Sequence, residues 1–435
     1  MTARMTARLQ VVRPDGRRIA SGRLLDEPVT YPVDSATPSV IFADDLPAHL
    51  ARYGERPQAT GGAGLRLIDI LDHVGLDGRG GGHFPVAAKW RTHLAAGGGG
   101  VVVANAAESE PASAKDTALL QLRTHLVLDG LMCAAEAVGA QDVVLWLHEG
   151  AHPVHAAVAR ALAERRAAGF AEPHVRMVAA PGRYVSGESS AIVRALSGGP
   201  ALPDFRLVPA SISGVHGMPT LVHNVETLAR TALAARPGGT GHPPTSLLTV
   251  ATAWGRTVVE VPCAQRLTQV IDGVLGPGAS RAHQAVLIGG YGGTWRDLRA
   301  SEMLRAAPSP GLSLGAGVLM PLHRDACGLA ETAAIAAFLA DSSARQCGPC
   351  VFGLRALADQ LAGLVDLRAR RRDVTRLTAV LDEISGRGAC HHPDGAVRMI
   401  ASAVATFGAD VRSHLRSSGC LHPGAGGFFP IRTAD

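Results

Sequence analysis

Residues 78–90 read GRGGGHFPVAAKW. Residues 101–116 read VVVANAAESEPASAKD and directly follow four consecutive glycines, Gly97–Gly100. The first segment predicts a glycine-rich turn and a short helix that begins near Phe84. The second predicts a buried apolar strand, then a polar acidic turn that starts the next helix. The glycine run between the two segments is typical of a flexible hinge.

The glycine-rich turn has the composition of an anion site. Backbone N–H groups can close around an anion where no Cβ intervenes, as at Gly78, Gly80, Gly81 and Gly82. Arg79 and Lys89 add cationic donors, and the positive end of the following helix points at the turn. The turn is therefore a candidate site for the phosphate of a nucleotide or flavin, although a plain solvent loop can have the same glycine content.

Two scarce residue types gather in the same part of the chain. Among 42 Lys and Arg residues only Lys89 and Lys115 are lysines, and the only asparagines are Asn105 and Asn224. Three of these four residues lie within 78–116. Because a compact ammonium and a carboxamide are not replaceable by arginine or a carboxylate, their retention marks this stretch as the functional centre.

Four motifs resemble a known family. The segment 78–90 resembles the flavin loop GRGGAGFPTGxKW of the NADH-binding flavoprotein subunit of respiratory complex I, a module also found in NAD-linked hydrogenases and formate dehydrogenases. ANAAESEP (104–111) is similar to the family's CNADESEP, and YVSGESS (184–190) to its YxCGEET. PTLVHNVETL (219–228) is similar to its PTTVNNVETL. In the family's order, and with a C-terminal cysteine region, the resemblance covers most of residues 65–400.

The resemblance implies an α/β fold in three parts after an N-terminal extension, residues 1–60. The expected parts are a Rossmann-like parallel-sheet flavin domain (61–240), a small ubiquitin-like β-grasp domain (241–305) and a C-terminal helical bundle of iron–sulfur type (325–425). A chain of 435 residues is long enough for two or three such cores.

Hydrophobic periodicity predicts the elements. Helices are expected at 65–74, 113–138, 153–167 and 189–196, and strands at 142–148 and 175–180. Alternating strands and helices indicate a parallel sheet with ligands at the carboxyl ends of its strands, where the glycine turn and residues 105–110 would lie. Short strand-like runs surround a helix at 264–274 within 246–303, and later helical patterns cover 329–340, 350–365, 373–385 and 394–418.

By resemblance, the chain holds FMN noncovalently, with NADH stacked against it. The residues carried over as FMN contacts are Gly78, Arg79, Gly80, Gly81, Lys89, Asn105, Glu108, Ser109, Tyr184, Gly187, Glu188, Val222, His223, Asn224 and Thr227. Phe84 and Glu110 would face the nicotinamide nucleotide, and Arg206 is loosely aligned with the family's cationic residue there. No catalytic side chain is expected, because the flavin performs the hydride chemistry.

The cysteine region departs from the family pattern S-C-G-x-C-x-P-C plus a distant cysteine, which supplies four thiolates to a [4Fe–4S] cluster. Residues 343–350 read SARQCGPC, so Ala344 replaces the first ligand and the remaining candidate metal ligands are Cys347, Cys350 and Cys390. A cluster with one iron bound by another group, a three-iron cluster and no cluster all remain open. Stand-in ligands would be Ser343, His391, His392 or Cys420; three other cysteines in apolar settings are expected in the core, namely Cys133, Cys263 and Cys327.

Three further substitutions concern the nucleotide. Ala107 replaces the family's aspartate in NADES, and Ser189 replaces the second glutamate of GEET. His83 replaces a glycine of the flavin loop and adds bulk where a ring system would pass. These changes make FMN binding a firmer expectation than NADH oxidation.

Amino-acid composition and charge argue against membrane-spanning, nucleic-acid-binding and secreted proteins. The chain is 47% hydrophobic, 4% aromatic and 18% charged, with a formal charge of +5, as in α/β proteins without a membrane span. The arginine cluster at 368–372 predicts a solvated helix face, or a surface for an acidic partner such as a ferredoxin, and no nucleic-acid signature accompanies it. With no signal core and no transmembrane segment, a cytoplasmic location is expected, with docking on a membrane complex left open.

The leading hypothesis is an FMN-dependent NADH:acceptor oxidoreductase subunit, which passes electrons through FMN and any iron–sulfur cluster to a ferredoxin-like or complex partner. The alternative is a catalytically degenerate homologue that keeps the fold as a binding or assembly subunit. A third hypothesis keeps the enzyme but changes the donor, so that reduced ferredoxin feeds electrons to the flavin instead.

Overall fold

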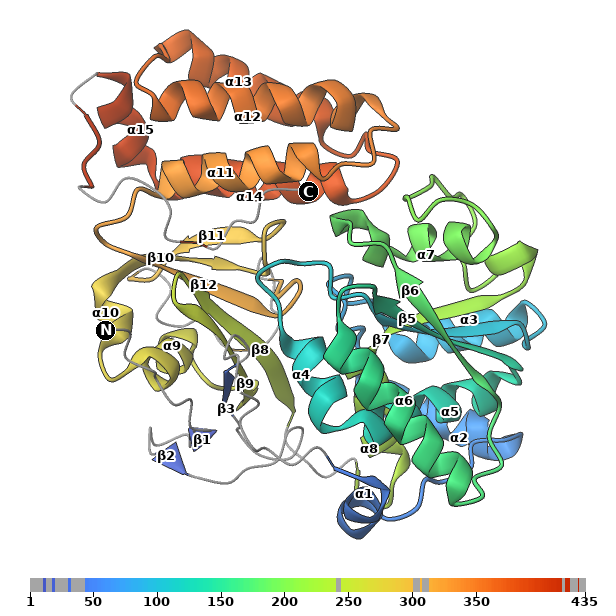
Figure 1. Ribbon diagram of the computed structural model, residues 1–435. Helices are drawn as coiled ribbons and strands as arrows, with labels where there is room; N and C mark the ends of the chain where they lie inside the picture. The colour runs from blue at the N-terminus through green and yellow to red at the C-terminus, as the bar shows by residue number, and fades with distance from the viewer. Residues whose placement is uncertain are drawn as a thin grey trace.

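The structure is a computed structural model, and it describes residues 11–12, 18–19, 30–32, 44–239, 244–299, 306, 313–416, 419–422 and 429. Two large β-sheets lie side by side, and a layer of C-terminal helices packs against one of them (Figure 1). No helix in the described ranges is both long and apolar enough to cross a lipid bilayer.

The first sheet has four parallel strands in the order β6-β5-β4-β7. They are β4 (Val101–Ala106), β5 (Asp142–His148), β6 (Val175–Ala180) and β7 (Thr220–Asn224). The strands are near-continuous apolar runs because helices cover both faces. This confirms the predicted parallel sheet, and β7, which is not among the strands expected from the sequence, is an additional edge strand.

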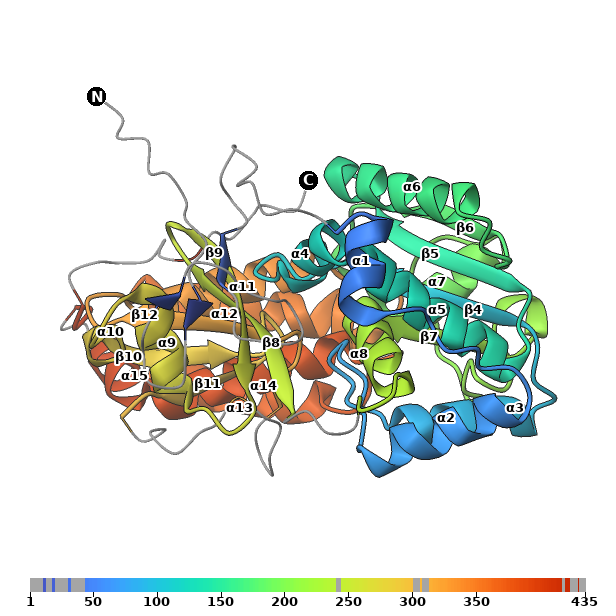
Figure 2. The ribbon, with the colours of Figure 1, turned by 90° about the horizontal axis from the view of Figure 1, so that it is seen from below.

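Alternate residues of the strands face different helices. On one face Val102, Ala104 and Leu145 pack in the core of α2 (Gly62–His73), α3 (Val86–Ala95), α4 (Lys115–Leu122), α5 (Thr124–Val138), α6 (His152–Ala167) and α8 (Val225–Ala235). On the other face Val103 and Trp146 pack against α7 (Ser189–Leu196). Figure 2 shows α6 beside β5 and β6, and α2 with α3 toward the other edge of the sheet, where α3 contacts β7.

The helix expected at 113–138 is two helices. Arg123, with φ −136° and ψ 43°, separates α4 from α5. Helix α5 then passes so close to α8 that a Cβ on Gly130 would lie 1.8 Å from the Leu228 carbonyl oxygen. This close packing helps to place the PTLVHNVETL motif (219–228), which runs into the start of α8, beside strand β4.

The second sheet is mixed, in the order β11-β10-β12-β8-β9-β3. Its strands are β3 (Thr30–Pro32), β8 (Thr245–Thr252), β9 (Gly255–Pro262), β10 (His283–Ile288), β11 (Thr294–Asp297) and β12 (Val318–His323). Helices α9 (Leu267–Leu275) and α10 (Ala279–Ala282) follow β9. Because β12 pairs in parallel with β8, and β3 pairs with β9, this sheet takes strands from outside the interval 241–305.

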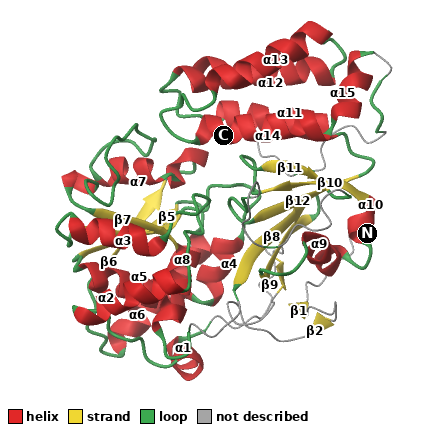
Figure 3. Ribbon diagram, turned by 180° about the vertical axis from the view of Figure 1, so that it is seen from behind, coloured by secondary structure: helices red, strands yellow, loops and turns green. Residues whose placement is uncertain are grey.

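Five helices form the C-terminal layer (Figure 3): α11 (Gly328–Asp341), α12 (Leu354–Val365), α13 (Arg371–Ile384), α14 (His392–Thr406) and α15 (Gly408–Leu415). The pattern at 394–418 is therefore two helices, broken at Phe407. A π-helical turn, Pro349–Gly353, precedes α12. The described residues also form β1 (Val11–Val12), β2 (Arg18–Ile19), α1 (Leu46–Tyr53) and two short 3-10 helices, Tyr184–Gly187 and Val215–Gly217.

Candidate functional site

Three segments that are distant in sequence meet at the carboxyl edge of the first sheet. The parallel strands β4 and β7 place Asn105 directly opposite Asn224. A Cβ built on Gly80 would lie 3.4 Å from the Cβ of Asn224. The glycine turn and the two scarce asparagines are therefore neighbours in the fold.

The glycine turn is closed at its base and anchored in the middle. The Gly78 amide donates to the Phe84 carbonyl over 3.0 Å. The Arg79 amide donates to the hydroxyl of Thr227, on α8, over 2.9 Å. Gly81 has φ +97° and packs against Gly315, a position that a side chain would strain. His83 has φ +46°, so it holds a left-handed conformation at the position where the family has glycine.

Lys89 is a partly buried cation without a counter-ion among the described residues. Its ammonium donates to the Val222 carbonyl over 2.6 Å, and no carboxylate lies within ion-pair distance among the described residues. Burial lowers the pKa of Lys89 to about 8. Beside it, the Trp90 indole donates to His223 Nε2 over 2.8 Å, and burial with the Lys89 charge holds the pKa of His223 well below its usual value. His223 is therefore a neutral acceptor.

The acidic turn after β4 is held by its own polar groups. Glu108, at φ +36°, accepts hydrogen bonds from the amides of Asp116 and Thr117 over 2.9 and 2.7 Å and thereby caps α4. Asn105 donates to the Gly187 carbonyl over 2.8 Å. Ser109 packs against the same glycine, where a Cβ would lie 2.9 Å from its hydroxyl. These contacts lock the second and third motifs together.

A compact cluster of charged side chains contacts the side chain of Asn224. The Lys115 ammonium is 2.8 Å from Asp116 Oδ1, 3.1 Å from Glu226 Oε2 and 3.3 Å from Asn224 Oδ1. The Asn224 amide in turn donates to Asp116 over 2.6 Å. Burial opposes ionisation of Glu226, but Lys115 and Arg230 outweigh it and lower the pKa of Glu226 to about 2.

Asp116 responds differently to the same cluster. Its burial and the charge of Glu108 outweigh the attraction of Lys115 and raise the pKa of Asp116 to about 6. Lys115 itself is only 2% exposed, and its carboxylate neighbours raise its pKa. Lys115 is therefore part of a buried polar network, and the scarcity of lysine in the sequence marks this position.

Glu110 joins the two sheets. It accepts the Tyr184 hydroxyl over 3.1 Å and the Tyr291 amide over 3.0 Å, and Gly290 leaves room for it because a Cβ there would lie 2.6 Å from its carboxylate. Burial raises the pKa of Glu110 to about 7. This carboxylate is committed to an internal contact between the domains, at 9% exposure.

The other residues expected at the nucleotide lie in contrasting settings. Phe84 is 58% exposed at the end of the glycine turn, so its ring is available for stacking. The Arg206 guanidinium donates to the Ser213 carbonyl. Glu188 caps α7 by accepting the amides of Ser190 and Ala191.

We call the glycine turn (78–84) together with Lys89, Asn105 and Asn224 the cradle. Its charges and unpaired donors fit an anionic ligand such as a flavin phosphate. The Lys89 ammonium has no counter-charge, and among buried polar atoms Arg79 Nε and both ring nitrogens of His83 lack partners in the described part of the chain. Arg79 and His83 line a narrow crevice whose other residues are Lys115, Glu226, Ser246, Leu247, Leu248, Leu314, Gly315 and Gly317. Its volume of about 10 Å³ suits one water molecule, so a larger group there would displace one of these side chains.

The three candidate cysteine ligands, Cys347, Cys350 and Cys390, lie near one another in the fold. The Cys350 amide donates to the Cys347 carbonyl over 3.1 Å. Burial, with the nearby thiols of Cys347 and Cys390, raises the pKa of Cys350 to about 12. Cys390 is likewise close to Glu188 of the YVSGESS turn. Three neighbouring thiols fit three corners of a cluster, and Ala344 offers no fourth donor.

The proposed stand-in ligands are separated by the fold. The Ser343 hydroxyl is buried without a partner among the described residues, His391 is exposed beside Asp394, and His392 bonds to the Leu339 carbonyl over 2.8 Å. Cys420 lies instead beside Cys327, at the opposite end of α11 from Cys347, which puts it about 20 Å away.

The cysteines expected in the core follow that expectation in two cases. Cys133 and Cys327 are buried, while Cys263 is only partly buried and contacts Ser246.

Two family models match the chain. Residues 71–232 match the Nuo51 FMN-binding domain, and residues 330–414 match the NADH-ubiquinone oxidoreductase-F iron-sulfur binding region. The chain is a divergent member of the family formed by the F subunits of NADH-quinone oxidoreductases. The F subunit from Streptomyces coelicolor is 26% identical over 380 residues, covering 81% of this chain and 84% of that protein. The F subunit from Aquifex aeolicus is 30% identical over 173 residues, 38% and 40% of the two chains.

Among solved structures, the chain resembles an NAD+-reducing [NiFe]-hydrogenase in its H2-reduced state. The TM-score is 0.73 at 26% identity, over 87% of this chain. The match spans 65% of the hydrogenase chain. The family's parallel sheet, mixed second sheet and C-terminal helices are thus all present.

Proposed function

We propose that this chain binds FMN at the carboxyl edge of its first sheet and serves as an electron-transfer subunit that takes electrons from NADH. The observation that carries the proposal is the convergence of the glycine turn, Asn105 and Asn224 beside the ammonium of Lys89. A partly buried cation that no carboxylate of the described residues neutralises is best explained by an anionic ligand.

The residues of the cradle divide the work. Lys89 and Arg79 neutralise a phosphate, and the glycines let backbone amides approach it. Asn105 and Glu108, held by Gly187 and the start of α4, form a fixed polar edge. Phe84 presents an aromatic face toward solvent for a nucleotide. When bound, FMN accepts a hydride and releases single electrons.

The YVSGESS turn supports a route from this cradle to the cysteine region. Tyr184 packs on Phe338 and His392, with ring centroids 5.7 and 5.5 Å apart. Arg194 of α7 donates to Gln346, which donates to the Pro203 carbonyl, both over 2.8 Å. We propose that Cys347, Cys350 and Cys390 hold an iron–sulfur cluster by three thiolates, and that a ferredoxin-like or complex partner receives the electrons.

We also propose the finer division of the fold: a Rossmann-like flavin domain, and a ubiquitin-like unit to which β3 and β12 add strands. Under this division, residues 61–240 carry the cofactor and 325–425 the cysteine region.

The test is an anaerobic purification of the whole chain, reconstituted with FMN and then with iron and sulfide. The expected protein is yellow, and NADH bleaches its flavin band. A colourless protein that takes up no FMN contradicts the proposal.

A second candidate function is favoured by two observations. The Glu110 carboxylate accepts a hydrogen bond from the Tyr291 amide inside the protein. The carboxylates of the family's NADES and GEET motifs are replaced by Ala107 and Ser189. These features suit a subunit that binds FMN but does not accept electrons from NADH. Stoichiometric FMN that NADH leaves oxidised, and that dithionite reduces, would establish this candidate in place of the first.

A further inference from the structure

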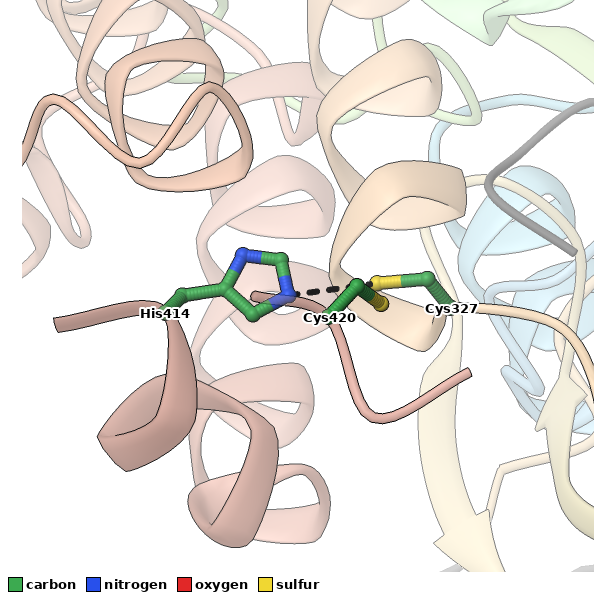
Figure 4. Close-up of side chains that lie close together, drawn as sticks. All are labelled: Cys327, His414 and Cys420. Carbon is green, nitrogen blue, oxygen red and sulfur yellow. Dashed lines mark hydrogen bonds between the residues drawn. The ribbon is translucent and has the colours of Figure 1, made fainter. Parts of the chain in front are cut away.

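A second group of metal-ligating side chains lies outside the proposed cofactor sites. Cys327, His414 and Cys420 each offer one ligand atom, and these atoms lie within 4.8 Å of one another (Figure 4). They come from the residue before α11, from the last turn of α15 and from the segment that follows α15. Nothing in the proposed electron route uses them.

His414 is oriented for metal binding before any ion arrives. Its Nδ1 lies 3.1 Å from the Leu364 carbonyl, which can only accept, so Nδ1 carries the proton. The Nε2 lone pair therefore faces Cys327 Sγ, 3.9 Å away. A backbone carbonyl that fixes the tautomer in this way is the usual outer partner of a metal-bound histidine.

Both thiols lie beside backbone groups that hold them in place. Cys327 is the N-terminal cap residue of α11, so it lies at the positive end of that helix. The His422 amide donates to Cys420 Sγ over 3.5 Å. Cys327 and His414 are 1% and 2% exposed, whereas Cys420 is partly exposed and leaves a path for an ion.

We propose that Cys327, His414 and Cys420 bind one Zn²⁺ ion. Tetrahedral zinc with two sulfurs and one nitrogen places its ligand atoms about 3.5–3.8 Å apart, which these atoms reach with shifts of roughly 1 Å or less. Soft thiolates with an imidazole are a donor set that zinc favours. Within the described residues no fourth Cys, His, Asp or Glu joins the group, so the fourth position takes water or another small ligand.

The ion would tie together three parts of the C-terminal layer. It would join the start of α11 to α15 and to the chain after it, while the Leu364 carbonyl links the site to the end of α12. The site lies about 20 Å from the cysteine turn at the other end of α11. Its role is therefore structural and does not depend on the proposed function.

The main competing arrangements are a Cys327–Cys420 disulfide and a pair of thiols without metal. The test uses the full chain prepared under reductant, with Cys347, Cys350 and Cys390 replaced by serine to remove competing thiolates, and the wild-type chain in parallel in case the triple variant does not fold. Zn²⁺ per chain is measured by elemental mass spectrometry, and Co²⁺ replaces Zn²⁺ as a spectroscopic probe.

We expect one tightly bound ion per chain and a sulfur-to-cobalt charge-transfer band. Cys420→Ser and His414→Gln should each weaken Zn²⁺ binding at least about 100-fold. The matched control Cys263→Ser, which removes a partly buried thiol elsewhere, should leave binding unchanged. In the wild-type background, Cys420→Ser should remove one equivalent of zinc. No uptake, affinity insensitive to His414→Gln, or a Cys327–Cys420 disulfide in the reduced preparation would overturn the proposal.

Discussion

The cradle at the first sheet and the cysteine turn after α11 use their functional residues in different ways. In the cradle, the residues expected at FMN also hold the fold: Asn224 caps α8, Glu108 caps α4 and Thr227 anchors the glycine turn. In the cysteine turn, Ala344 lies in a half-exposed loop, and its methyl group has no polar atom that the fold must pair. A ligand can therefore be lost from the turn at little cost to the fold, whereas Asn224, Glu108 and Thr227 cannot be lost from the cradle in this way.

The largest expected effect comes from the ion cluster of the cradle. Lys115→Met leaves Asp116 and Glu226 buried without their cation and should lower the free energy of unfolding by about 3–5 kcal/mol, even without FMN. Urea denaturation measures it. The exposed pair partner Arg368→Met serves as control and should change stability by less than about 0.5 kcal/mol. A similarly small loss for Lys115→Met would remove the contrast between the two regions.

Lys89 should affect binding rather than folding. Its folded pKa of about 8 lies below the ordinary 10.5, so the desolvated ammonium destabilises the fold at neutral pH, and this cost fades as the pH rises past 8. A phosphate at Nζ favours the charged form, so FMN affinity should fall above about pH 8, by up to about tenfold per pH unit.

Lys89→Met should weaken FMN binding about 10–100-fold, abolish that pH dependence and leave the protein at least as stable as before. Fluorescence titration of FMN across pH 6–10 (a range chosen to span roughly two units on each side of the lowered value) measures it. Arg91→Met, on the exposed side of the same helix, is the control. Unchanged affinity would show that Lys89 is not at the phosphate.

In the cysteine turn, Ala344→Cys restores the thiol that the family has at this position. Ala344→Cys should raise the iron retained after anaerobic reconstitution to about four per chain, with roughly tenfold slower loss of the cluster on dilution. FMN affinity should stay within about twofold, because the cradle does not depend on the turn. Iron analysis and electron paramagnetic resonance of the reduced protein measure the change. If the variant retains no more iron than the wild type, residue 344 does not face the other three thiols.

The smallest effect concerns backbone strain in the same turn. Arg345 has φ +53° where the family pattern has glycine. Arg345→Gly should relieve this conformation and stabilise the protein by about 0.5–1 kcal/mol, whereas Arg345→Ala, which keeps the strain, should not. Thermal unfolding of the two variants distinguishes the outcomes.

Much of the first sheet was predictable from local pattern. The strands Asp142–His148 and Val175–Ala180 and the helix Ser189–Leu196 occur with the expected bounds, because their burial follows a short periodic run. The scarcity of lysine and asparagine also located the cradle, since Asn105 and Asn224 pair across adjacent strands.

Other features depend on partners far along the chain. That Lys115 is buried follows from Glu226 on another helix, and Glu110 is withdrawn from solvent by the turn at Tyr291 in the second sheet. The zinc candidate likewise unites residues whose spacing resembles no linear metal motif. Local sequence sets which segments are helix, strand or glycine turn, because propensity and periodicity act over a few residues. Which charges meet, and which thiols share a site, is set by packing, because desolvation and coordination act only where distant segments come into contact.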